Sequence, residues 1–191
     1  MNIYLDHVLD QPWRTQHPDV PLLRYADDLL LLCRDSQEAE HCLTDLRSQL
    51  QPAGMMLKTP SRKGHIRDLA AGRDIDWLGF RVKKNRGDLS IRPGRAAFTQ
   101  LAMRLARAHE APVPSLTGAA VIRGWFDQMG PTRKRAHRSR AYANVAAVAA
   151  KAGFDEIPRE ERAMTLWSAA YAQWCCLTES VASTTQRAER V

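Results

Sequence analysis

The sequence predicts an α+β fold, with short apolar strands in the first half of the chain and amphipathic helices in the second half. Two apolar runs flank acidic residues in the segment 22–33, as the strands of a hairpin do. Apolar residues recur at helical spacing over 36–50, and segments typical of helices follow residue 93. The 191 residues are 45% hydrophobic and 26% charged, which excludes the disordered and collagen-like classes.

The first half of the chain predicts one helix before the hairpin and one after it. Apolar side chains at helical spacing make residues 1–10 the end of a helix whose beginning we expect before Met1. The prolines of 11–21 predict a loop. Asp35 is placed to cap a helix over 36–50, which Gly54 ends.

The middle of the chain predicts short strands separated by a basic loop. Residues 55–58 are a strand candidate, and 59–72 are basic and loop-like. Residues 76–82 alternate well enough for one strand, which 85–88 connect by a turn to a partner at 89–91.

The second half predicts four helices. Prolines and Gly153 separate helical segments over 94–108, 115–129, 133–152 and 159–177, and we expect the polar residues after Glu179 to fray. The predicted organisation is a strand-containing region over 1–92, a helical region over 93–152, and a C-terminal helix and tail of unknown role over 153–191.

Charge and composition bound the class of partner. The chain has 28 Lys and Arg against 21 Asp and Glu, so its net charge of +7 favours a polyanion, with nucleic acid ahead of a membrane surface. The sequence has no apolar run of about 18 residues and no signal-peptide pattern at its start, so we expect a cytoplasmic protein without a membrane partner. The four cysteines lack zinc-site spacing and predict reduced thiols.

Two adjacent carboxylates, Asp27 and Asp28, are the sharpest candidates for chemistry. Carboxylates at a hairpin tip repel each other, and a divalent cation such as Mg²⁺ removes that repulsion. Nucleotidyl transfer to a primer 3′-end uses two such ions, one to activate the attacking hydroxyl and one to stabilise the leaving pyrophosphate. A solvated Asp-Asp turn without a cation is the alternative, because Asp is a common turn residue.

Four ordered motifs resemble those of reverse transcriptases of the bacterial group II intron type, a family that includes retron-like relatives. Residues 25–28 read Tyr-Ala-Asp-Asp, like the catalytic hairpin of the family. Residues 54–57 (Gly-Met-Met-Leu) resemble the next motif, 77–80 (Trp-Leu-Gly-Phe) the primer-grip hairpin, and 122–126 (Ile-Arg-Gly-Trp-Phe) a thumb motif. The resemblance covers about residues 1–130 and implies a partial polymerase palm, an antiparallel sheet with a catalytic β-hairpin and a packed helix, followed by an α-helical thumb.

The resemblance also implies roles for individual residues. Asp27 and Asp28 would be catalytic carboxylates that hold Mg²⁺. Tyr25 would border the nucleotide and primer end, and a half-buried strand aromatic is the alternative for it. The primer-grip-like residues would hold the primer backbone; for Trp77 and Phe80, packing in the core is the alternative. The primer-grip-like residues are Trp77, Leu78, Gly79 and Phe80.

Basic side chains would contact the phosphate backbone of a template–primer duplex, or form a solvated basic face. These residues are Lys58, Lys63, Arg123, Arg133, Lys134, Arg135 and Arg138. Relatives carry a lysine that protonates pyrophosphate; its usual position falls near Ser61 here, between two of these lysines, and is unassigned. We expect Trp125 to pack between helices. We expect Trp167 and Trp174 to lie in the core, with a partner surface as the alternative.

The resemblance implies an RNA template, a DNA primer and a dNTP as partners. In relatives, a further metal-binding aspartate and the fingers lie upstream of the catalytic hairpin, and only 24 residues precede Tyr25. We therefore expect the two-ion site to be incomplete in this chain and dNTP incorporation by the chain alone to be absent. A truncated enzyme and a split enzyme, whose second chain supplies the missing parts, are both open. The alternative is a non-catalytic module that binds RNA or assists splicing.

Overall fold

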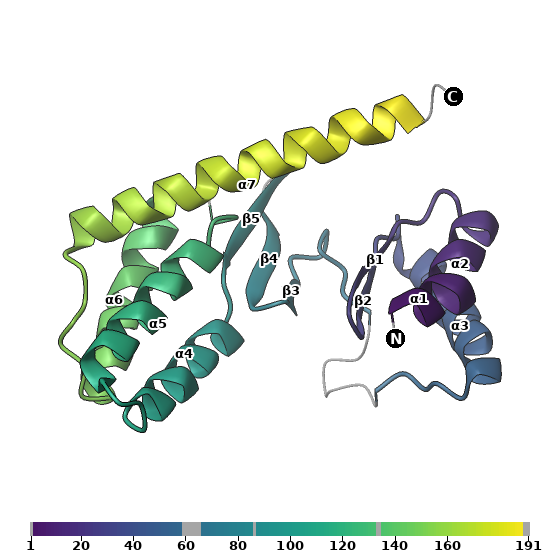
Figure 1. The fold of residues 1–191 in the computed structure, drawn as a ribbon. Coiled ribbons are helices and arrows are strands. Elements are labelled where there is room, and N and C mark those ends of the chain that lie inside the picture. The colour runs from purple at the N-terminus through teal and green to yellow at the C-terminus, as the bar shows by residue number, and fades with distance from the viewer. Residues whose placement is uncertain (1, 59–65, 86, 133–134, 189–191) are drawn as a thin grey trace. The chain divides into compact units, whose positions relative to one another are not determined.

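The computed structural model describes residues 2–58, 66–85, 87–132 and 135–188. The chain forms two compact units that divide between Arg73 and Asp74 (Figure 1). The strands of residues 74–93 therefore lie in the second unit. The prediction from the sequence grouped them with the hairpin expected over 22–33, in one region over 1–92. The mixed α+β class is confirmed, with one small antiparallel sheet in each unit.

The first unit begins with consecutive helical segments. An α-helical turn, α1 (Asn2–Leu5), leads into a π-helical segment, η1 (Asp6–Asp10), and then into α2 (Gln11–Gln16). The loop expected from residue 11 onward is therefore wrong up to Gln16. Pro12 stands in the first turn of α2, and the burial of Trp13 holds this turn against the core.

The predicted hairpin is confirmed as β1 (Leu22–Tyr25) and β2 (Asp28–Leu31). The two strands are antiparallel and Tyr25 pairs with Asp28, so Ala26 and Asp27 form a two-residue loop. One face of the hairpin packs on a core that also receives side chains from the first helices and from α3 (Ser36–Leu50). The buried members of this core are Leu5, Leu9, Trp13, Val20, Cys42, Leu46 and Leu50.

Helix α3 begins and ends as the sequence predicts. The Asp35 side chain accepts a 2.8 Å hydrogen bond from the backbone N–H of Glu38. A 3-10 turn, η2 (Gln51–Ala53), continues the helix to Gly54, whose φ of 67° favours glycine. The strand expected over 55–58 is wrong, since the described residues there pair with no strand and partly buried Met55 and Leu57 pack on the core instead.

The second unit contains a three-stranded antiparallel sheet of β3 (Asp74–Trp77), β4 (Phe80–Asn85) and β5 (Asp88–Pro93). The single strand expected over 76–82 is wrong, because a tight turn at Leu78 and Gly79 divides it into two paired strands. The loop residues have φ values of 49° and 83°, as a type I′ turn requires. The predicted turn between β4 and β5 is confirmed by the pairing of Asn85 with Asp88.

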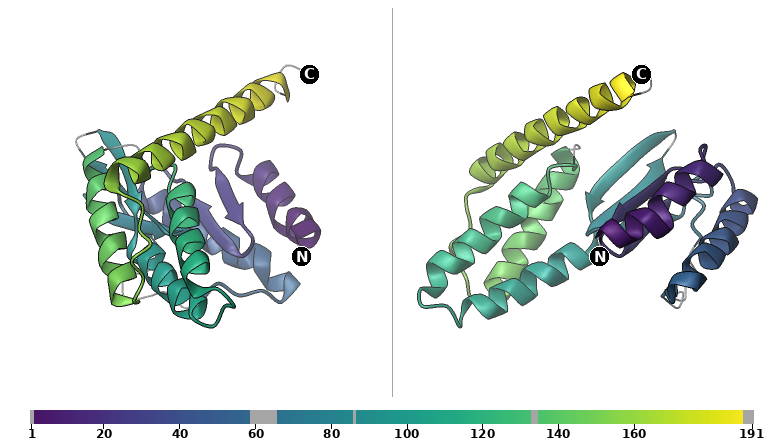
Figure 2. Two further views of the ribbon diagram at one scale, coloured as in Figure 1. Left: turned by 60° about the vertical axis from the view of Figure 1, so that its left-hand side comes forward. Right: turned by 45° about the vertical axis from the view of Figure 1, so that its right-hand side comes forward.

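Four helices complete the second unit, as the sequence predicts. They are α4 (Arg95–Ala108), α5 (Pro114–Gln128), α6 (Arg135–Lys151) and α7 (Glu160–Ala188). Helix α7 packs against α5 and α6, and its later turns extend beyond them (Figure 2). The fraying expected after Glu179 is wrong for the backbone, which is helical to Ala188.

Aromatic side chains fill the core between these helices. Trp125 and Trp167 are 3% and 0% exposed, and their rings meet edge to face at 5.9 Å. Their indole N–H groups donate to the carbonyls of Ala97 and Met129. The core positions predicted for these two tryptophans are thus confirmed, whereas Trp174 is only half-buried. Among the described residues, none of the helices has both the length and the apolar character needed to cross a bilayer.

Candidate functional site

The hairpin of the first unit presents both candidate carboxylates to solvent. Asp27 lies in the two-residue loop and Asp28 is the first residue of β2, with side chains 64% and 53% exposed. The preceding loop residue, Ala26, has a φ of 54°, which costs a non-glycine residue about 1–2 kcal/mol. Tyr25 is 65% exposed beside them, so it is a surface side chain rather than a core residue. The tip is therefore an open acidic site.

A lysine lies against these carboxylates. Lys58 Nζ is 3.2 Å from Oδ2 of Asp27 and 4.0 Å from Oδ1 of Asp28. Its hydrogen bond lowers the pKa of Asp27, with help from a backbone hydrogen bond and from the lysine charge. The structure thus brings Lys58 together with both predicted carboxylates, across 31 residues of sequence. The other lysine candidate, Lys63, lies outside the described residues.

The chemistry of the tip fits Mg²⁺. This ion takes oxygen ligands, keeps several waters, and is held by one or two carboxylates together with substrate phosphates. Asp27 and Asp28 supply two such carboxylates. The ammonium of Lys58 lies against both, so a positive charge already stands where a bound cation would lie. Within the part of the chain that the structure describes, no third Asp, Glu, His or Cys joins them. The remaining ligands of a bound ion would be water and phosphate oxygens.

Sequence reasoning missed an ion pair on the opposite side of the hairpin. Arg24 precedes the tip in β1, and its guanidinium donates to the carboxylate of Asp10 at the end of η1. The two side chains are only 14% and 16% exposed. A signal was present in the sequence, because an arginine on the same strand face as the core-facing Leu22 needs a buried acceptor. The identity of that acceptor depends on how η1 packs against the hairpin, and the sequence does not show this.

The primer-grip-like residues form the β3–β4 turn. Phe80 is partly buried against the helical core, so the packing alternative holds for this ring. Trp77 is half-buried, and its indole N–H has no hydrogen-bond partner among the residues that the structure describes. Leu78 and Gly79 make the turn itself, and the carbonyl of Gly79 accepts a 2.7 Å hydrogen bond from Gly94. The turn is therefore fixed to the start of α4.

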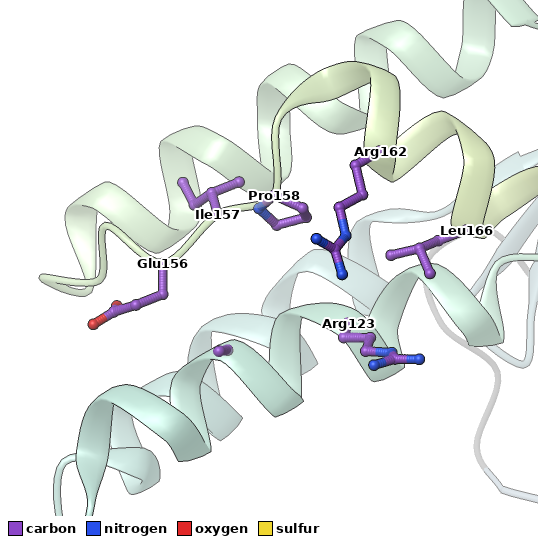
Figure 3. A pocket seen from close by; sticks show the side chains of 7 residues that line it. Arg123, Glu156, Ile157, Pro158, Arg162 and Leu166 are labelled. Carbon is purple, nitrogen blue, oxygen red and sulfur yellow. The ribbon is translucent and has the colours of Figure 1, made fainter.

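One of the predicted basic residues lines a pocket of about 270 Å³. Arg123 lies on α5 and Arg162 on α7, and the rest of the lining is mainly aliphatic. Figure 3 shows Arg162 reaching toward α5, whereas the carboxylate of Glu156 points away from both guanidinium groups. The Glu156 carboxylate instead accepts a hydrogen bond from Ser115, which lowers its pKa. The two arginines thus form an exposed cationic pair that sequence reasoning had recognised only in part.

Arg138 is placed differently. It is 8% exposed, its Nε donates to the carbonyl of Thr132 at 2.7 Å, and its Nη1 donates to Ser168 at 3.1 Å. Its guanidinium also lies 5.9 Å from the ring centroid of Trp167, and burial lowers its pKa. We therefore remove Arg138 from the predicted phosphate contacts, because its guanidinium already joins α6 to the carbonyl of Thr132 and to Ser168 on α7.

The remaining basic candidates are not placed in a site. Arg133 and Lys134 lie outside the described residues. Arg135 begins α6, but its side chain lies beyond the described part of the structure. Comparison of the chain with models of known protein families, with curated proteins and with solved structures finds no match.

Proposed function

We propose that the chain carries the catalytic hairpin and the helical thumb of an RNA-directed DNA polymerase of the group II intron type. The observation that supports this most is the hairpin tip. Two adjacent carboxylates stand exposed at the hairpin tip, Asp27 in the two-residue loop and Asp28 at the start of β2, and a lysine from another segment lies against both. A solvated Asp-Asp turn does not require contact with a lysine that lies 31 residues away in the sequence.

In this proposal, Asp27 and Asp28 hold Mg²⁺ at the primer 3′-end. Held by these two carboxylates, Mg²⁺ would supply Lewis acidity toward the primer hydroxyl and positive charge toward the pyrophosphate. An aspartate is ionised at neutral pH, and the contact with Lys58 lowers the pKa of Asp27 further, so this carboxylate accepts a cation without first losing a proton. Exposure of both carboxylates leaves room for the waters and phosphate oxygens that complete the shell.

Lys58 has a second role in the proposal. Its side chain is 80% exposed, so it can leave Asp27 when a cation binds and turn to the phosphates of an incoming dNTP. An exposed ion pair contributes little free energy, so this exchange is easy. Lys58 is therefore our candidate for the lysine that meets pyrophosphate.

The helical unit would bind the template–primer duplex through its phosphates. Arg123 and Arg162 present guanidinium groups beside an aliphatic surface, and such groups bind phosphate in a bidentate manner. The partners are an RNA template, a DNA primer and a dNTP. Further ligands for a second Mg²⁺ would come from outside Asp27 and Asp28, including from another polypeptide.

A binding module that retains the grip on RNA without catalysis is the second candidate. The net charge of +7 and the Arg123–Arg162 pair support RNA binding whether or not the hairpin binds a cation. The two candidates differ at the hairpin tip, because only the polymerase needs Asp27 and Asp28 to bind a divalent cation.

Binding of Mn²⁺, a paramagnetic substitute for Mg²⁺, separates the two candidates. Electron paramagnetic resonance of the free ion, titrated with the chain, should show a site that Asp27→Asn weakens by at least tenfold. Asp88→Asn, at an exposed strand end in the second unit, is the matched control and should bind Mn²⁺ as the wild type does. Equal Mn²⁺ binding by the wild type and Asp27→Asn would leave the RNA-binding module as the function.

A further inference from the structure

Arg24 lies on the core-facing side of the hairpin strand that leads into the acidic tip. Strand β1 alternates between half-buried and exposed positions, so Leu22 and Arg24 share one face and Leu23 and Tyr25 the other. A guanidinium on the core-facing side loses water and needs an acceptor there. A charged side chain thus occupies the position next to the tip, where an aliphatic side chain would lose less free energy of hydration.

Asp10 supplies the acceptor with fixed geometry. Nε of Arg24 lies 2.9 Å from each carboxylate oxygen of Asp10, and Nη2 lies 2.5 Å from Oδ2. Several short contacts between a guanidinium and one carboxylate fix the orientation of both groups, which a single contact would not do. Asp10 follows Leu9, which is completely buried, so the carboxylate is anchored to the core of the first unit.

The remaining terminal nitrogen of this guanidinium reaches the loop. Nη1 of Arg24 lies 3.4 Å from the carbonyl oxygen of Ala26, at the long end of hydrogen-bonding distance. Ala26 has a φ of 54°, a conformation that a non-glycine residue keeps only when its surroundings hold it. Arg24 therefore connects an anchored carboxylate to the loop in which Asp27 stands.

The charge of the pair also matters for a cation at the tip. Arg24 carries a positive charge two residues before Ala26, and alone it would repel a divalent ion bound to Asp27 and Asp28. The carboxylate of Asp10 compensates this charge at contact distance. The pair therefore contributes geometry to the loop without adding net positive charge.

We propose that Asp10 and Arg24 are positioning residues, which hold the Ala26–Asp27 loop in the conformation that binds a divalent cation. This inference rests on the proposed function of the hairpin. It predicts that replacing either residue weakens cation binding in a chain that is still folded, although neither side chain is a ligand. Replacing a residue that orients a metal ligand typically weakens metal affinity by about 10–100-fold.

Mn²⁺ titration of the 191-residue chain tests the inference. Arg24→Lys keeps the charge and loses the planar fork, and Asp10→Asn keeps the shape and loses the charge. Each should weaken Mn²⁺ binding about tenfold and move the amide resonances of Ala26 and Asp27 in ¹H–¹⁵N spectra. If Asp10→Asn fails to fold, Asp10→Glu retains the charge and should still weaken binding, because the longer side chain displaces Arg24.

Two controls separate positioning from stability. Arg14 lines the same small pocket as Asp10 and Arg24 but is 70% exposed, so Arg14→Gln should bind Mn²⁺ normally. Asp35→Ala removes the N-cap of α3 and destabilises the first unit away from the loop, and it should also bind normally while folded.

The outcomes of the titration are distinct. Unchanged Mn²⁺ affinity in folded Arg24→Lys and Asp10→Asn chains would overturn the positioning role while leaving the proposed function intact. Equal weakening by Asp35→Ala would also overturn it, since stability alone would then explain the effect. Equal Mn²⁺ binding by the wild type and Asp27→Asn would instead overturn the proposed function, and the cation role of the pair with it.

Discussion

At the scale of single residues, the acidic tip is an arrangement of charges that substitutions can separate. Lys58 contacts Asp27 at 3.2 Å while both side chains remain largely exposed. Such a pair lowers the pKa of Asp27 but adds little to folding. The ammonium also occupies space that a cation would need. We therefore expect Lys58 to lower the pKa of Asp27 and, at the same time, to compete with a cation at the tip.

Replacing Lys58 by Gln should tighten Mn²⁺ binding by about two- to fivefold, because a competing exposed ammonium is removed. Titration of the free-ion signal measures this affinity. Lys84→Gln, at an exposed position of β4, is the control for the change in net charge and should have no effect. Weaker Mn²⁺ binding by Lys58→Gln would show that the lysine supports the cation instead of competing with it.

The pH dependence of the Asp27–Lys58 pair follows from the direction of the pKa shift. The pKa of Asp27 is lowered from 3.8, so the interaction is fully present above that value and is lost as the pH falls through the lower folded-state pKa. The carboxyl ¹³C resonance of Asp27 should titrate below 3.8 in the wild type and move back toward that value in Lys58→Gln. A midpoint that Lys58→Gln leaves unchanged would contradict the contact.

Arg138 shows how a charge in a basic stretch can be structural. Because its guanidinium is buried and hydrogen-bonded, Arg138→Met should destabilise the second unit, by about 1–3 kcal/mol, through loss of bonds to Thr132 and Ser168. Urea unfolding followed by tryptophan fluorescence measures the change. Arg140→Met, at an exposed position of the same helix, should alter the unfolding free energy by less than about 0.5 kcal/mol. Equal effects of the two substitutions would contradict the structural role.

At the scale of elements, two tight turns place the candidate site residues. Both turns have two loop residues and contain a non-glycine residue with positive φ, Ala26 in the first unit and Leu78 in the second. Positive φ is least favourable for bulky side chains, so Leu78 stores the greater strain. The type I′ geometry of that turn is the one that Asn-Gly favours.

Replacing Leu78 by Asn should therefore stabilise the second unit, by about 0.5–1.5 kcal/mol, since the left-handed conformation costs Asn less. Gly79→Ala should have the opposite sign, because Gly79 has a φ of 83° although its added Cβ would meet Ala97 at an ordinary 3.7 Å. Unfolding curves of both variants check the pair. Destabilisation by Leu78→Asn would mean that contacts of the leucine side chain outweigh the backbone strain.

The sequence predicted elements whose signals are local. The hairpin, the Asp35 cap and the Gly54 end of α3 each depend on a few neighbouring residues, and all three are confirmed. The α2 helix was missed because prolines at 12 and 18 are typical of a loop. The β3–β4 turn was missed because Leu78 is an unfavourable residue type for positive φ.

Predictions that depend on packing were less complete. The Asp10–Arg24 pair joins residues 14 apart through the way η1 meets the hairpin, and no periodicity in the sequence encodes that contact. The buried position of Arg138 likewise depends on the approach of α7 to α6. Lys58 was named as one of two candidate lysines, and only the fold brings it to Asp27.

At the scale of the whole molecule, the positive charge should appear as salt-dependent binding to nucleic acid. Each phosphate contact that is lost lowers the slope of log affinity against log salt by about 1. Arg123→Gln and Arg162→Gln should each reduce the slope for an RNA–DNA duplex, while Arg104→Gln on α4 is the matched exposed control. An unchanged slope in both pocket variants would contradict the duplex contact.

The proposed polymerase uses the hairpin of the first unit and the helices of the second unit in one reaction, so the most direct measurement is the cation dependence of binding to a primed template and dNTP. A DNA primer that ends in a dideoxynucleotide cannot be extended on its RNA template. The affinity of the chain for this primed template can therefore be measured in the presence of a matching dNTP. We predict that Mg²⁺ tightens this binding and that Asp27→Asn removes the tightening without removing basal RNA binding. Equal affinity with and without Mg²⁺, in the wild type as in Asp27→Asn, would contradict the assignment of the hairpin to nucleotidyl transfer.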